Sequence, residues 1–226
     1  MSIIQSIIGS SFIQASNWIY PPPGDLYPVS GNYQMLTSAP LVVTGYYEAS
    51  SISAPTLGLW RQTFNGMALD GSNLDSNFPG SYTQVQSLAD PYVGFGNAPD
   101  RNQQFTMEFT GYFKPTNTSN FVFEMAIDDY AYMWIGQNAV SGYTVSNAVI
   151  AANNADVVTS GAIPLIADKY YPVRIIYTEN TGNHNCTVWS GWNGTTLLNN
   201  QQSATSGQFY YDNGQPIDFP NTGLII

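Results

Sequence analysis

Hydrophobic and polar positions alternate along the stretch from Asn120 to Gly136, which reads NFVFEMAIDDYAYMWIG. The apolar side chains at every second position are Phe121, Phe123, Met125 and Ile127, followed by Tyr132 and Trp134. A period of two residues is typical of β-strands that bury one face. We therefore predict two half-buried strands that are joined at Asp128 and Asp129.

The two aspartates are the first candidate for chemistry. Consecutive side chains of an extended strand point to opposite faces, so Asp128 and Asp129 can reach one cation only if the backbone bends sharply or their peptide bond is cis. The simpler interpretation is a solvated turn. A cis bond with both carboxylates converging on residues 179–184 would favour a binding site. A trans bond with splayed carboxylates would favour a scaffold.

Short strand-like runs separated by Gly and Pro continue from Gly58 to the end of the chain. No segment longer than about ten residues keeps the 3.6-residue period of a helix, so we expect little helix. The predicted fold class for residues 57–226 is all-β, an antiparallel β-sandwich or barrel.

Residues 1–56 differ from the rest of the chain because they are rich in proline and contain no lysine or arginine. Such a segment favours extended backbone, and we predict an extended N-terminal arm with short strands near Tyr33–Leu36 and Leu41–Tyr47. Its apolar start packs either on the chain's own core or on a neighbouring subunit. We expect residues 1–20 and the C-terminus to contact other structural subunits.

The composition narrows the class of partner. Of the 226 residues, 9% are charged, and the formal net charge is −10 with five Lys and Arg in total. Nucleic-acid binding needs clustered basic residues, so it is excluded as a function, and a divalent cation suits this chain better. The single cysteine, Cys186, cannot form an internal disulfide.

The first residues carry a further expectation. Met1–Ala15 has neither the basic start of a secretory signal nor enough continuous apolar residues to span a membrane. We therefore recognise no signal peptide and no membrane span. We expect an extracellular protein or a protein of the virion surface, released within a virus or phage particle.

Several segments resemble the PA14 family, and less closely its yeast-flocculin branch. They lie in the family's order and are Phe105–Phe113 with Lys114 and Pro115, Phe121–Asp129, Tyr132–Gly136, Tyr170–Tyr177, Glu179 with Asn180, and Val188–Gly191. Gly58–Gly66 is similar to the opening strand of that family. The resemblance implies a β-sandwich found in toxins, glycosidase accessory domains and adhesins.

The resemblance also implies a Ca²⁺ site that binds sugars. In calcium-dependent members the paired aspartates and an amide side chain from a later loop hold the ion, and sugar hydroxyls complete its shell. Carried onto this sequence, the metal ligands are Asp128, Asp129 and Asn180, with Glu179 as the alternative to Asn180. Composition alone favours an ordinary hairpin tip at Glu179 and Asn180.

Aromatic side chains near these loops are candidates for stacking on sugar rings. The candidate ligand-binding residues are Tyr130, Tyr143, His184 and Trp192. Trp189 is expected to face the core. Residues 137–153 correspond to the variable loop of adhesin members.

Catalytic motifs are lacking in the sequence. It contains no phosphate-binding glycine loop, no HExxH motif and no nucleophile elbow, and His184 is the only histidine. We therefore predict a non-enzymatic surface protein that binds an extracellular or cell-surface glycan with the help of calcium. The alternative is a purely structural capsid or appendage subunit that assembles without binding sugar.

Overall fold

The computed structural model describes residues of one compact unit, Val43–Ile226. The described residues are 43–71, 73–90, 94–96, 104–153, 157–182, 184–192, 198–199, 207–212, 219 and 225. The predicted contacts of residues 1–20 and the predicted strand Tyr33–Leu36 lie outside these residues. In the described ranges, no helix has the length and apolar character needed to cross a bilayer.

In the part of the chain that the structure describes, two large antiparallel sheets and a small two-stranded one form the unit, and the predicted all-β fold is confirmed. The larger sheet has the order β1-β16-β7-β13-β9-β10, with β2 pairing β5 and β7, and the smaller has the order β11-β8-β14-β15, with β12 on β8 and β6 on β14. The strands of the larger sheet are β1 (Pro55–Leu57), β2 (Leu59–Asn65), β5 (Gln84–Asp90), β7 (Phe105–Pro115), β9 (Tyr130–Ile135), β10 (Ile150–Asn153), β13 (Tyr171–Glu179) and β16 (Gly207–Asp212). Those of the smaller sheet are β6 (Gly94–Gly96), β8 (Ser119–Asp128), β11 (Val158–Thr159), β12 (Ile163–Leu165), β14 (Asn185–Trp192) and β15 (Leu198–Asn199).

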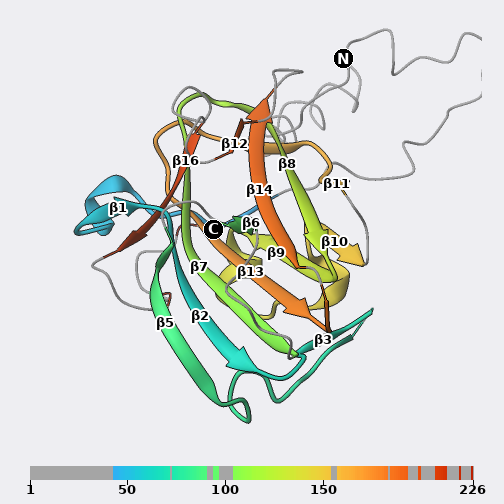
Figure 1. Ribbon diagram of the computed structural model, residues 1–226. Helices are drawn as coiled ribbons and strands as arrows, with labels where there is room; N and C mark the ends of the chain where they lie inside the picture. The colour runs from blue at the N-terminus through green and yellow to red at the C-terminus, as the bar shows by residue number, and fades with distance from the viewer. Residues whose placement is uncertain are drawn as a thin grey trace, which may run out of the picture. The chain divides into compact units, whose positions relative to one another are not determined.

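The remaining elements are short. They are the hairpin strands β3 (Leu69–Asp70) and β4 (Asn73–Leu74), the helix α2 (Gln137–Val140), and the 3₁₀ turns η2 (Ala49–Ser51) and η3 (Val145–Asn147). Figure 1 shows β8 and β14 as long neighbouring strands of one sheet, and β7 and β13 as neighbours in the other.

Aromatic side chains fill the space between the sheets. The ring of Phe113 in β7 lies 5.5 Å from that of Phe121 and 4.9 Å from that of Phe123, both in β8. Burial alternates along β8, as its sequence pattern predicts. Edge-to-face pairs of this kind add roughly 0.5–1.5 kcal/mol each beyond the area that they bury.

Strand β9 is not half-buried as predicted, because every residue from Ala131 to Ile135 is buried. Its outward side chains, Tyr132 and Trp134, are covered by an outer cluster. The buried members of this outer cluster are Phe64, Ala68, Leu69, Phe78, Tyr132, Trp134, Ala139 and Ile176. Alternate side chains of β9 therefore face two different cores, whereas the prediction assumed a core on one side and solvent on the other.

Residues 43–56 are part of the sandwich, so the predicted boundary at residue 56 does not coincide with the start of this unit. The N–H of Tyr47 donates to the carbonyl of Tyr170 at 2.8 Å, and Tyr46 exchanges backbone hydrogen bonds with Ile225. The side chain of Tyr47 is 1% exposed. Burial of this aromatic residue stabilises the segment against the sheet.

Two strands share one edge of β7. Strand β2 pairs with Phe105–Thr110, and β16 pairs with Tyr112–Pro115. Gly111 lies at the junction, where a Cβ atom would be 2.4 Å from the backbone oxygen of Tyr210. The close approach of the backbones explains the glycine at this position.

Candidate functional site

The ends of four strands meet at one end of the sandwich. Strand β13 ends beside the start of β9, because Thr178 pairs with Tyr130. Strand β14 begins beside the end of β8, because Asn185 pairs with Asp128. The turn that contains the two aspartates and the loop that follows β13 are therefore neighbours, although about 50 residues separate them in the sequence.

Two hydrogen bonds tie the aspartate turn to β13 and its following loop. The peptide bond between Asp128 and Asp129 is cis. The backbone N–H of Asn180 donates to Oδ2 of Asp129 at 2.8 Å. The hydroxyl of Tyr177 donates to the backbone carbonyl of Asp128. One carboxylate of the pair thus lies directly beside residue 180.

Glu179 lies inside the sandwich, below the aspartate turn. It is the last residue of β13, and it has no exposed surface. Its Oε2 lies 2.7 Å from the hydroxyl of Tyr177, whereas its Oε1 has no hydrogen-bond partner among the described residues. A phenol carries one proton, so Tyr177 donates to either Glu179 or Asp128 at a given moment. The hairpin tip favoured by composition is therefore wrong for Glu179.

The electrostatic environment of Glu179 is negative. Burial raises the pKa of its carboxyl above the ordinary value, and the charges of Asp129 and Asp128 raise that pKa further. The hydrogen bond from Tyr177 and the nearby His184 act in the opposite direction. Carboxylates that repel one another in this way favour a bound cation, which would relieve the repulsion.

The donor atoms at this end of the sandwich are oxygens. In the ranges that the structure describes, no three His, Cys, Asp or Glu side chains gather closely enough to hold a metal. The expected shell has only two carboxylates, and its other ligands are an amide oxygen and main-chain carbonyls, so it needs no such group of three. Ca²⁺ prefers oxygen ligands of these kinds. These residues fit a calcium ion.

Asn180 occupies the exposed side of the site. Its side chain is exposed, and its Oδ1 accepts a hydrogen bond of 2.9 Å from Nε2 of Gln104. An amide oxygen has two lone pairs, so this bond leaves one acceptor direction open. Neither Gln104 nor Tyr177 was a candidate from the sequence. The sequence could have indicated Tyr177, because residues two positions apart in a strand share a face, and Tyr177 lies two positions before Glu179.

The four candidate ligand-binding residues differ in where they lie. The imidazole of His184 lies at this end of the sandwich, 6.0 Å from the ring of Phe105. Tyr130 also lies at this end, directly after Asp129, but its side chain packs against the outer cluster, as that of Tyr143 does. The backbone of Trp192 pairs with Phe121, at the opposite end of β14 from Asn185, so this residue is not brought to the aspartate turn.

Comparison with protein families gives a match to part of the chain. The family model of the GLEYA domain matches residues 105–189, which run from the start of β7 into β14 and include the aspartate turn. A comparison with curated protein sequences found no match.

Solved structures of adhesin and PA14 domains share this fold. The Epithelial Adhesin 9 A domain from Candida glabrata, solved with Galβ1-4GlcNAc, is 19% identical with a TM-score of 0.58, covering 81% of this chain and 99% of that chain. The Epithelial Adhesin 6 A domain from Candida glabrata, solved with Galβ1-3GlcNAc, is 16% identical with a TM-score of 0.56 over 81% and 97%. The PA14 domain of the antifreeze protein MpAFP is 14% identical with a TM-score of 0.52 over 69% and 93%. The resemblance predicted from the sequence is confirmed, and the chain has a PA14-like fold.

Proposed function

We propose that this chain is a non-enzymatic carbohydrate-binding module with a calcium site at the end of the sandwich. The observation that carries the proposal is the connection of the aspartate turn to the loop after β13. The Asn180 N–H contacts the carboxylate of Asp129, and Tyr177 contacts the carbonyl of Asp128. This connection supports a site whose ligands are held near one another before the ion binds, which would lower the cost of ordering them.

Asp128, Asp129 and the side-chain oxygen of Asn180 would hold the ion, together with main-chain oxygens of the loop after β13. Asn180 is a better candidate than Glu179 for the side-chain ligand after β13. Asn180 is exposed beside Asp129, whereas Glu179 is buried between the sheets. The buried carboxylate of Glu179 would add negative charge to the surroundings of the ion. Bound Ca²⁺ would offer coordination positions to two neighbouring sugar hydroxyls. His184 lies close enough to this end of the sandwich to contact a bound sugar.

The similar structures support the glycan as ligand class. Two adhesin A domains with this fold were solved with galactose-containing disaccharides. An adhesive function implies a location on an outer surface, of a cell or of a particle. The expected virus or phage particle is not supported by these similarities and stays a prediction, as do the contacts with other structural subunits.

A glycan array tests the proposal. The wild-type chain should bind a set of glycans in calcium that it does not bind in EDTA. Asp129→Asn should lose the same glycans even in calcium, because it removes one ligand charge and keeps the shape of the side chain. Asp70→Asn makes the same charge change at an exposed position of β3, and it should bind as the wild type does.

Two results would contradict the proposal. One is binding that is equal in calcium and in EDTA. The other is the absence of any glycan ligand in calcium, which would favour the alternative of a structural subunit.

A further inference from the structure

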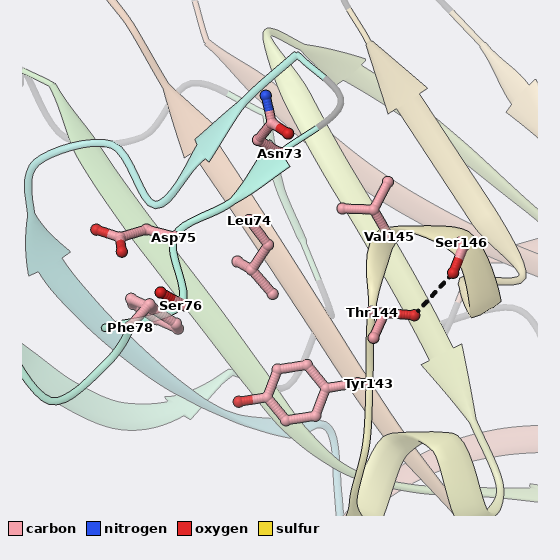
Figure 2. A pocket seen from close by; sticks show the side chains of 9 residues that line it. All are labelled: Asn73, Leu74, Asp75, Ser76, Phe78, Tyr143, Thr144, Val145 and Ser146. Atoms are coloured by element: carbon pink, nitrogen blue, oxygen red, sulfur yellow. Dashed lines mark hydrogen bonds between the residues drawn. The ribbon is translucent and has the colours of Figure 1, made fainter.

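A second concave site has a lining that contains neither of the two aspartates of the turn. Its volume is about 640 Å³, within the range of roughly 300–1,000 Å³ that is usual for small-molecule sites. Figure 2 shows two chain segments on either side of it, one from β4 and the turn after it and one ending at η3. The lining residues are Asn73, Leu74, Asp75, Ser76, Phe78, Tyr143, Thr144, Val145 and Ser146.

The aromatic ring of Tyr143 is held in place by contacts with two neighbouring side chains. The guanidinium carbon of Arg174 lies 4.5 Å from its ring centroid, and the ring of Trp134 lies at 5.4 Å. Arg174 is itself held by an ion pair with Glu108 and by a hydrogen bond to the carbonyl of Ala139. Tyr143 is therefore a preorganised apolar surface of the pocket.

The segment around Tyr143 is held by side-chain hydrogen bonds. Nε1 of Trp134 donates to the carbonyl of Thr144 at 2.8 Å, and the N–H of Thr144 donates to Oδ1 of Asn147 at 2.8 Å. Nδ2 of Asn147 donates to the carbonyl of Gly142 at 3.0 Å. These bonds hold the backbone that presents the hydroxyls of Thr144 and Ser146, which lie 3.0 Å apart (Figure 2).

The opposite wall is equally well supported. The ring of Phe78 packs edge to face on Phe64 at 5.1 Å and on Tyr82 at 5.3 Å. The carboxylate of Asp75 accepts hydrogen bonds from the N–H of Asn77 at 2.9 Å and from the hydroxyl of Tyr82 at 2.8 Å. The bond from Asn77, followed by that from Tyr82, holds the pKa of Asp75 below its ordinary value. Asp75 thus presents a fixed, ionised acceptor.

The lining residues define the ligand by their chemistry. Tyr143, Phe78, Leu74 and Val145 offer apolar surface, while hydroxyls, an amide and a carboxylate offer both donors and acceptors. No lysine, arginine or histidine is among the lining residues, so an anion has no counter-charge there. Arg174 already covers one side of the Tyr143 ring, which disfavours a cation on that ring.

From these features we propose that the pocket between residues 73–78 and 143–146 binds one neutral sugar unit, and that it does so without calcium. A pyranose has an apolar ring face for the aromatic surface and hydroxyls for the polar rim. The lining residues of the pocket include neither aspartate of the turn nor Asn180. On the Tyr143 wall, the supporting Arg174 precedes Thr178 in β13 by four residues, about 13 Å along a strand. The opposite wall is nearer to Thr178, because Leu74 pairs with Leu69, whose N–H donates to Oγ1 of Thr178 at 3.2 Å.

Saturation-transfer NMR in EDTA tests this pocket independently of the calcium site. The probes are the methyl glycosides of glucose, galactose, mannose and N-acetylglucosamine, with tetramethylammonium as a competing class. We expect saturation transfer to at least one glycoside from the wild type and from Asp129→Asn. We expect its loss in Ser146→Trp and in Asn73→Trp, which place an indole at the pocket from opposite walls. Asn117→Trp, at the exposed turn between β7 and β8, should keep the signal.

Thermal melting of each variant shows which of the two pocket variants is folded, and one folded variant is sufficient. The proposal is overturned if no glycoside receives saturation in EDTA, or if the signal survives in a folded pocket variant. Binding of tetramethylammonium in place of the glycosides would also overturn it. Calcium-dependent glycan binding that persists in Ser146→Trp supports two separate sites.

Discussion

The backbone N–H of Asn180 donates a 2.8 Å hydrogen bond to Oδ2 of Asp129. This bond connects the residue before β9 with the loop that follows β13, so the two residues that would share one ion, Asp129 and Asn180, are neighbours. A preformed site costs less to order when a ligand binds. The bond also orients one oxygen of Asp129 towards the loop and leaves the other available.

Tyr177→Phe should weaken calcium binding. The variant removes the hydroxyl that contacts the carbonyl of Asp128 and the carboxylate of Glu179, and the fold should lose about 1–3 kcal/mol because a buried carboxylate loses its partner. Tyr171→Phe is a matched control in the same strand, where the hydroxyl accepts the N–H of Ile166 at 2.9 Å. Both variants should be less stable, but only Tyr177→Phe should bind calcium more weakly in a calorimetric titration. Equal calcium affinity in the two variants would show that Tyr177 does not position the site.

Glu179→Gln separates the stability of the fold from its affinity for the ion. The pKa of Glu179 is raised chiefly by burial and then by Asp129 and Asp128, so removing its charge should leave the metal-free fold at least as stable as the wild type. Calcium affinity should fall roughly tenfold, which corresponds to about 1.4 kcal/mol. Glu124→Gln is the control at a half-buried position of β8. It should not raise the stability of the metal-free fold by removing a repelled charge, and it should not lower the calcium affinity. A Glu179→Gln variant with unchanged calcium affinity would exclude this carboxylate from the electrostatics of the site.

The sequence predicts the strand positions and the aspartate turn well. The apolar residues of β8 alternate because only one face of that strand meets the core. In β9 the same period is misleading, since Tyr132 and Trp134 meet a second core made by residues far away in the chain. Periodicity reports that two faces differ, but it does not report what covers each face.

The candidate site is only partly readable from the sequence. Glu179 and Asn180 are adjacent, yet one is buried and the other is exposed, because β13 ends between them and alternate residues face opposite sides. Trp192 follows His184 closely in the sequence, but an antiparallel strand of eight residues carries it to the far end of the sandwich. Such placements depend on strand length and register, which composition does not fix.

Gly111→Ala should destabilise the sandwich by about 1–3 kcal/mol, the usual cost of overpacking. Its Cβ would lie 2.4 Å from the backbone oxygen of Tyr210 and 2.4 Å from Cδ2 of Leu59. Gly161→Ala is the control, because its Cβ would meet no atom within 4 Å. Urea unfolding should give a lower midpoint for Gly111→Ala alone. Equal midpoints would mean that β2 and β16 do not approach β7 as closely as described.

Tyr82 should give the fold a dependence on alkaline pH. Burial and then the hydrogen bond to Asp75 raise the pKa of its phenol from 10.0 to about 12. The folded state therefore holds the phenol proton more tightly than the unfolded chain, and this stabilisation is complete below pH 10 and is lost as the pH rises towards 12. The stability difference between the wild type and Tyr82→Phe, about 1–2 kcal/mol at neutral pH, should shrink over that interval. A difference that stays constant to pH 12 would contradict the role of this hydrogen bond.

A calcium titration of the purified chain, followed by thermal melting, tests the proposed site most directly. An ion that binds only the folded state stabilises it by about 2.7 kcal/mol at a hundredfold excess over the dissociation constant. We expect the melting temperature of the wild type and of Asp70→Asn to rise with the logarithm of the calcium concentration, and that of Asp129→Asn to stay constant. An unchanged melting temperature in the wild type, or an equal rise in Asp129→Asn, would contradict a calcium site at the aspartate turn.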